Sequence, residues 1–135
     1  MRFSVKMAVA ALLTAAVAYF GSASAADDVK DVKGCMAFQN KVRGDLGKMV
    51  KAKDPKWDEV QKSTKDWVKI AESIGTFKPP KGTDDSWKEQ TGKYLTNVKA
   101  VDAAAEKKDV DGVSKGLATI MGSCAGCHSQ HRPKK

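Results

Sequence analysis

Three side chains near the end of the sequence have the types and spacing of a cofactor-attachment motif. Cys124, Cys127 and His128 stand in the order Cys-Ala-Gly-Cys-His. Two thiols three residues apart can form thioether bonds to the two vinyl groups of one haem, and the next imidazole then lies beneath the iron as its proximal ligand. The motif therefore predicts one covalently attached haem c, held by Cys124 and Cys127, with His128 bound to the iron.

Other uses of a Cys-x-x-Cys pair fit the sequence poorly. A thioredoxin-like redox pair belongs in a βαβ setting, and beyond residue 26 the sequence shows no sustained period-two run of apolar residues. A structural zinc site needs a second pair of ligands at suitable spacing, which the sequence does not supply. Haem attachment is the interpretation that remains.

The first 25 residues have the features of a secretory signal peptide. Arg2 and Lys6 form a positive n-region, Met7 to Phe20 is an apolar run, and Ala23 and Ala25 supply the small-residue cleavage pattern. The run is too short to span a membrane and no stop-transfer segment follows, so an uncleaved anchor is the weaker alternative. We expect export to the periplasm or an equivalent extracytoplasmic compartment, with no membrane anchor after cleavage.

The mature chain, residues 26–135, is expected to be basic. Removing residues 1–25 takes away Arg2 and Lys6 and no acidic residue, which lowers the formal net charge from +8 to +6. Nucleic acid is not an expected partner of an exported protein. The charge therefore concerns solubility or docking to an acidic protein surface, such as that of a redox partner. The lysines are scattered, and basic residues cluster only in the tail, residues 132–135.

Apolar residues recur at helical spacing in four stretches of the mature chain, which predicts an all-α fold. The expected helices run from about 28 to about 53, from Trp57 to Gly75, from a cap at Thr83 or Asp84 to about Ala105, and from about Asp109 to His131. Two short connections and one of moderate length favour an antiparallel four-helix bundle. We expect one domain over residues 26–135 that encloses one covalently bound haem.

The position of the motif on the last helix adds a family resemblance. Arg132 follows His128 by four residues, Trp87 begins the third helix, and the tail is basic. In this pattern the chain resembles the cytochrome c-prime and cytochrome c556 family, the class II cytochromes c, over essentially all of its mature length. The resemblance implies a first helix that faces the distal side of the haem. It also implies that Arg132 screens the haem edge or a propionate, with an ordinary surface arginine as the alternative.

The distal side departs from the family pattern. The family's first-helix arginine, followed four residues later by leucine or methionine, is replaced by Cys35 and Gln39. Cys35 shares a helical stripe with apolar residues, so its thiol should point into the bundle, where it could bind ferric iron as a thiolate. Inert burial, an intermolecular disulfide, and ligation by Met36 after a one-residue rotation of the helix are the alternatives. His131 shares the helix of His128, cannot reach the opposite side of the iron, and is expected to be exposed.

A closer resemblance concerns the segment Gly34-Cys35-Met36. Within this bundle and with this haem motif, it is similar to the subunits of the NaxLS-type heterodimeric haem proteins of anaerobic ammonium-oxidising bacteria. That resemblance implies Cys35 as the distal ligand and His128 as the proximal one. It also implies a dimer with a related monohaem subunit, although a homodimer stays open.

Three classes of function are compatible with such a haem. The first is low-potential, single-electron transfer to a redox partner protein, and the second is binding of a diatomic gas, NO or CO. A five-coordinate cytochrome c-prime that binds or scavenges nitric oxide, with Cys35 only structural, is the alternative form of the second. The third is an enzyme acting on nitrogen oxides or peroxide, which is not expected because no proton donor is evident on the distal stripe.

Overall fold

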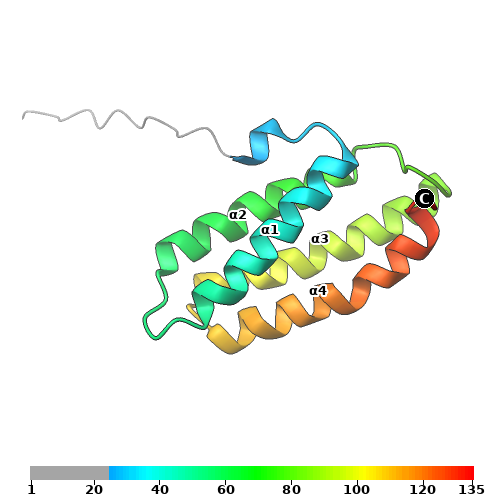
Figure 1. Cartoon of the computed structure of the whole chain (residues 1–135). Coiled ribbons are helices and arrows are strands. Elements are labelled where there is room, and N and C mark those ends of the chain that lie inside the picture. The colour runs from blue at the N-terminus through cyan, green and yellow to red at the C-terminus, as the bar shows by residue number, and fades with distance from the viewer. Residues whose placement is uncertain (1–24) are drawn as a thin grey trace, which may run out of the picture.

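The computed structural model describes residues 25–135 and shows an all-helical chain (Figure 1). No strand occurs within that range. This confirms the prediction of an all-helical bundle. Of the predicted signal peptide, residues 1–24 lie outside the described residues. The elements are a short 3-10 helix η1 (Ala25–Asp28) and the α-helices α1 (Val32–Val50), α2 (Trp57–Ile74), α3 (Asp84–Glu106) and α4 (Val110–His131).

Capping side chains fix where three of the helices begin. Asp31, Thr83 and Asp109 each accept a hydrogen bond from the backbone amide three residues later, at 2.7, 3.3 and 3.0 Å respectively. These bonds satisfy amides that have no partner within the helix. The cap at Asp31 explains why α1 begins at Val32 and not near residue 28, as the apolar spacing alone had predicted.

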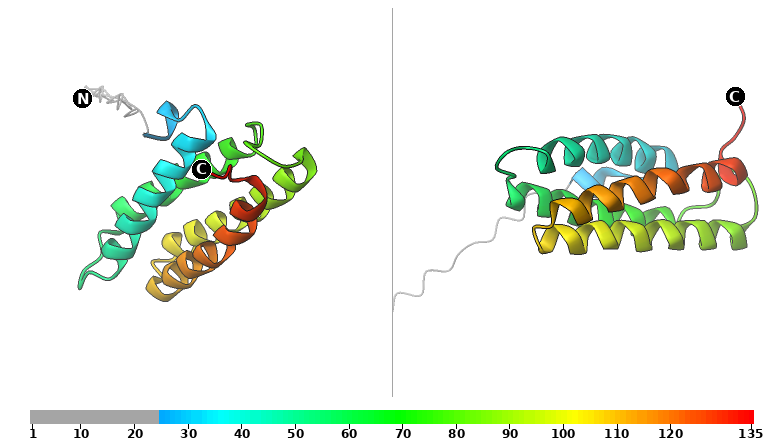
Figure 2. Two further views of the ribbon diagram at one scale, coloured as in Figure 1. Left: turned by 45° about the vertical axis from the view of Figure 1, so that its right-hand side comes forward. Right: turned by 90° about the horizontal axis from the view of Figure 1, so that it is seen from below.

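Consecutive helices run in opposite directions and are joined by short connections (Figure 1). α3 packs extensively on both α4 and α2, and α1 packs on α2. Contacts between α1 and α4 are much fewer, and Figure 2 shows these two helices standing apart. The bundle is therefore least tightly closed along the seam between its first and last helices.

The apolar core falls into two clusters. The larger draws residues from all four helices, including Leu46, Trp67, Val98 and Ile120, which are fully buried. The smaller comprises Ala26, Cys35, Ile70, Ile74 and Trp87, with Cys127 packed against it. Because α1 and α3 enter at the end where α2 and α4 finish, the smaller cluster lies at the end of the bundle that carries the Cys-x-x-Cys-His motif.

None of the helices in residues 25–135 is long and apolar enough to cross a membrane.

Candidate functional site

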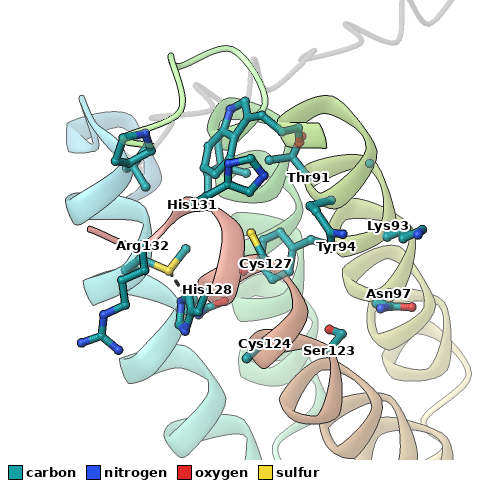
Figure 3. Close-up of a pocket in the computed structure, with 18 of the residues that line it drawn as sticks. Thr91, Lys93, Tyr94, Asn97, Ser123, Cys124, Cys127, His128, His131 and Arg132 are labelled. Atoms are coloured by element: carbon teal, nitrogen blue, oxygen red, sulfur yellow. Dashed lines mark hydrogen bonds between the residues drawn. The ribbon is translucent and has the colours of Figure 1, made fainter. Parts of the chain in front are cut away.

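The residues of the Cys-x-x-Cys-His motif lie in the last two turns of α4 and share one face of it (Figure 3). Side chains three and four residues apart in a helix are neighbours, so Cys124 lies next to both Cys127 and His128. All three line a single cavity. Both thiols are free, and each is partly exposed. The structure thus brings the three predicted attachment residues together on one cavity wall.

The cavity has a volume of about 1000 Å³. That places it at the upper end of the range of roughly 300–1,000 Å³ found for ligand and cofactor sites. Its walls come from α1, α3, α4, the end of α2 and the connection between α2 and α3. Apolar side chains from three of these helices contribute, among them Val32, Ile74 and Trp87. A cavity of this size beside the motif leaves room for a large, flat, mostly apolar group.

The charged groups that line the cavity all carry the same sign. They are Lys33 on α1, Lys93 on α3 and Arg132 at the end of α4. Lys93 forms an ion pair with Glu89 at 2.5 Å. Among the described lining residues there is no carboxylate. Cations without facing carboxylates suit a guest that carries negative charge at its edge, as the two propionates of a haem would.

Arg132 lines two neighbouring pockets. It lines the main cavity together with His128, and both also line a smaller hollow formed with Lys81, Lys134 and Lys135. Its backbone amide donates to the carbonyl of His128 at 3.1 Å, which ends the helix. Arg132 therefore lies beside His128, and its role toward a haem edge stays a prediction.

The wall opposite α4 is formed by α1, and there the two sulfur-bearing residues differ. The α1 residues on the cavity wall are Val32, Lys33, Met36, Gln39 and Asn40. With about 100° of rotation per residue, Met36 lies within about 60° of each of the other four, whereas Cys35 points about 100° away from Met36. Cys35 is only 1% exposed and belongs to the smaller core cluster. Met36, the alternative ligand, thus faces the cavity, and Cys35 is buried at the edge of this wall, about 40° beyond Gln39.

Burial also governs the ionisation of these thiols. It raises the pKa of Cys35 to about 11, the negative charge of Asp31 adds to the rise, and a backbone hydrogen bond opposes it. Burial likewise raises the pKa of Cys127, as does the neighbouring Cys124. In the protein alone the Cys35 thiol is therefore neutral at physiological pH. It would bind iron as a thiolate only if the charge of the metal offset this effect.

Gln39 is a buried polar residue of α1. It lines the cavity and is only 5% exposed. Its Nε2 donates to Sδ of Met36 at 3.5 Å, while its carbonyl Oε1 is buried with no hydrogen-bond partner among the described residues. The resemblance to the class II cytochromes c predicts Gln39 at the distal position, but its missing partner could be found only from the packing.

Tyr94 reaches the cavity from α3 and is held by the core. The buried Trp67 donates its Nε1–H to the hydroxyl oxygen of Tyr94 at 2.6 Å. Burial raises the pKa of Tyr94 well above its ordinary value. The hydroxyl therefore stays protonated and neutral, and the cavity keeps a polar, uncharged group on the α3 side.

His131 is buried, which corrects the expectation that it would be exposed. It is only 2% exposed, and its Nδ1 lies 2.7 Å from the carbonyl oxygen of Lys81 while its Nε2 lies 3.0 Å from Oγ of Ser86. A carbonyl can only accept, so Nδ1 carries a proton and donates it. The connection between α2 and α3 folds over this end of α4 and covers the ring, a long-range contact that helical periodicity cannot indicate.

Within residues 25–135, no group of three or more His, Cys, Asp or Glu side chains is arranged to hold a metal ion. Comparison of the chain with protein-family models, with curated proteins and with solved structures gave no match.

Proposed function

We propose that the chain is an exported, monohaem c-type cytochrome of the class II type. Cys124 and Cys127 would hold one haem c covalently, and His128 would be its proximal ligand. The observation that carries the proposal is that these three side chains line one cavity of about 1000 Å³. A haem bound there would supply one-electron redox chemistry and a site for a diatomic gas such as NO or CO.

The residues around the cavity support this function. Apolar side chains would exclude water from the porphyrin faces, and the cationic side chains Lys33 and Arg132 would meet the propionates, whereas Lys93 is paired with Glu89. Haem attachment through α4 would turn one porphyrin face toward His128 and the other toward α1. A porphyrin would also fill the loosely packed seam between α1 and α4 with apolar volume, which is favourable for a domain of this size.

Two sulfur donors on α1 compete for the sixth position on the iron. Ligation by Cys35 remains the prediction from the sequence, and a thiolate would stabilise ferric iron and lower the reduction potential. Met36 is already on the cavity wall, so it needs no rotation of α1 to face the iron. Cys35 would need the helix to turn toward the cavity as the haem enters. If neither sulfur binds, the iron is five-coordinate and open to gas.

Electron transfer and gas binding are favoured over enzymatic turnover by the state of His131. It is the histidine on the cavity wall besides His128, and both of its ring nitrogens lie within hydrogen-bond distance of Lys81 and Ser86. A histidine held in this way is poorly placed to deliver protons to a substrate. We further propose that the protein is located in the periplasm and exchanges electrons with a partner that has an acidic surface. It would form a dimer with a related monohaem subunit.

Absorption and electron paramagnetic resonance spectra of the ferric protein test the axial ligands. A low-spin signal with thiolate character that Cys35→Ala abolishes and Met36→Leu retains would assign the sixth position to Cys35. The opposite response of the two variants would assign it to Met36. A high-spin, five-coordinate signal in the unmodified protein would support the gas-binding alternative, and an absence of haem absorption would refute the proposal.

A further inference from the structure

The carbonyl oxygen of the Gln39 side chain is buried in the protein without a hydrogen-bond partner. Gln39 is the sole buried side chain of residues 25–135 for which this holds. Leaving such an acceptor unpaired costs about 1–3 kcal/mol. An apolar residue of similar size would avoid this cost, so a glutamine here calls for a partner that the protein alone does not provide.

The orientation of this amide follows from its neighbour. Its Nε2 lies 3.5 Å from Sδ of Met36. A thioether sulfur is a weak acceptor and has no proton to donate, so the NH₂ group must face the sulfur and the carbonyl must face elsewhere. The unpaired atom is therefore a hydrogen-bond acceptor, and the missing partner is a donor.

The position of Gln39 indicates where the donor would come from. Gln39 lies on the cavity wall formed by α1, across from the wall on which α4 presents His128. The last torsion of a glutamine side chain is soft, so rotation about it can turn the carbonyl toward the cavity in exchange for the weak Nε2–Sδ contact with Met36. A group bound in the cavity on the side of α1 would then lie within reach of an acceptor that has nothing else to bind.

We infer that Gln39 favours small ligands whose iron-binding atom carries a hydrogen, that is, ligands that bind iron through an N–H or O–H group. Amines, hydroxylamine and water belong to this class, whereas cyanide, CO and NO carry no hydrogen. The inference rests on the proposed haem site and adds to it a preference among the molecules that can enter. It does not depend on which sulfur, if either, binds the iron, because every added ligand would take the same sixth position.

Optical titration of the ferric holoprotein with methylamine and with cyanide tests the inference. We expect Gln39→Leu to weaken methylamine binding about tenfold and to change cyanide affinity by less than about twofold. Gln61→Leu is the matched control, since Gln61 bonds to the carbonyl of Ala105 and does not line the cavity. It should leave both affinities unchanged.

Two results would overturn the inference. An equal loss of affinity for both ligands in Gln39→Leu would show that the residue only shapes the cavity. Unchanged binding of both would show that the amide does not contact the ligand. Failure of the haem proposal would look different, because the unmodified protein would then lack a Soret band to titrate.

Discussion

The rings of Trp87 and His131 meet edge to face, with centroids 5.1 Å apart and planes at 71°. Each ring also bonds to the connection between α2 and α3: Trp87 donates to the carbonyl of Phe77 at 2.8 Å, and His131 to that of Lys81 at 2.7 Å. Both side chains line the cavity. This connection is therefore fastened at two points over the end of the cavity and holds the turn of α4 that carries His128.

The close fit at this connection makes Gly82 sensitive to substitution. Gly82 has a φ of +84°, and an added Cβ would lie 2.8 Å from Nδ1 of His131 and 2.9 Å from the carbonyl oxygen of Gln130. Gly82→Ala should therefore destabilise the protein by about 1–3 kcal/mol in urea unfolding. Gly44→Ala is the control, because its Cβ meets nothing within 4 Å in a helix, and it should stabilise by about 0.5–1 kcal/mol. Equal changes in the free energy of unfolding for the two variants would contradict the close packing of this connection against α4.

Gln39→Leu should stabilise the chain when haem is absent. The change removes a buried acceptor that has no partner, at nearly constant volume, so a gain of about 1 kcal/mol is expected. Urea unfolding in a Cys124→Ala/Cys127→Ala background, which cannot attach haem, measures it. A clear loss of stability would mean that Oε1 already has a partner, such as a bound water.

The raised pKa of Cys35 predicts loss of stability in alkali. The thiol has a folded-state pKa of about 11 against an ordinary value of 9.0, so the unfolded chain loses this proton first. Between about pH 9 and 11 the native state then binds more protons than the unfolded state, and stability falls as pH rises. The same haem-free background measures this fall, and adding Cys35→Ala should make it shallower. If the free energy of unfolding falls with pH equally steeply with and without Cys35, the thiol is exposed to water and not buried.

The two candidate distal sulfurs should differ in their effect on the reduction potential. If Cys35 is the ligand, Cys35→Ala removes a donor that stabilises ferric iron, so the midpoint potential should rise by on the order of 100 mV. Met36→Leu should then change it little. Potentiometric titration of both variants separates the donors, and a large shift in Met36→Leu alone would exclude thiolate ligation.

Local sequence signals predicted the helices well but not the contacts between them. The start of α2 at Trp57, its C-cap at Gly75 and the cap of α3 at Thr83, one of the two residues expected there, follow spacing and capping signals, because these signals act within one turn. Cys35 was expected to be buried, and it is. Its displacement from the cavity wall depends on how α1 is rotated against α4, and periodicity fixes that rotation only to within a residue.

The cavity shows the same division between local and long-range information. The motif placed Cys124, Cys127 and His128 on one helical face, as the structure has them. The burial of His131 arises from residues 45 to 50 positions earlier in the chain, beyond the reach of a local pattern. The absence of a partner for Gln39 depends on every neighbour at once, so a sequence pattern could not indicate it.

Covalent haem attachment is tested most directly by the intact mass of the protein purified from cells that mature c-type cytochromes. We predict the mass of residues 26–135 plus one haem, with visible absorption that stays on the polypeptide after acid–acetone extraction. Cys35→Ser should retain this added mass, and Cys124→Ser/Cys127→Ser should lose it. A mass equal to that of the polypeptide alone, or a haem that the solvent removes, would contradict the assignment of Cys124 and Cys127.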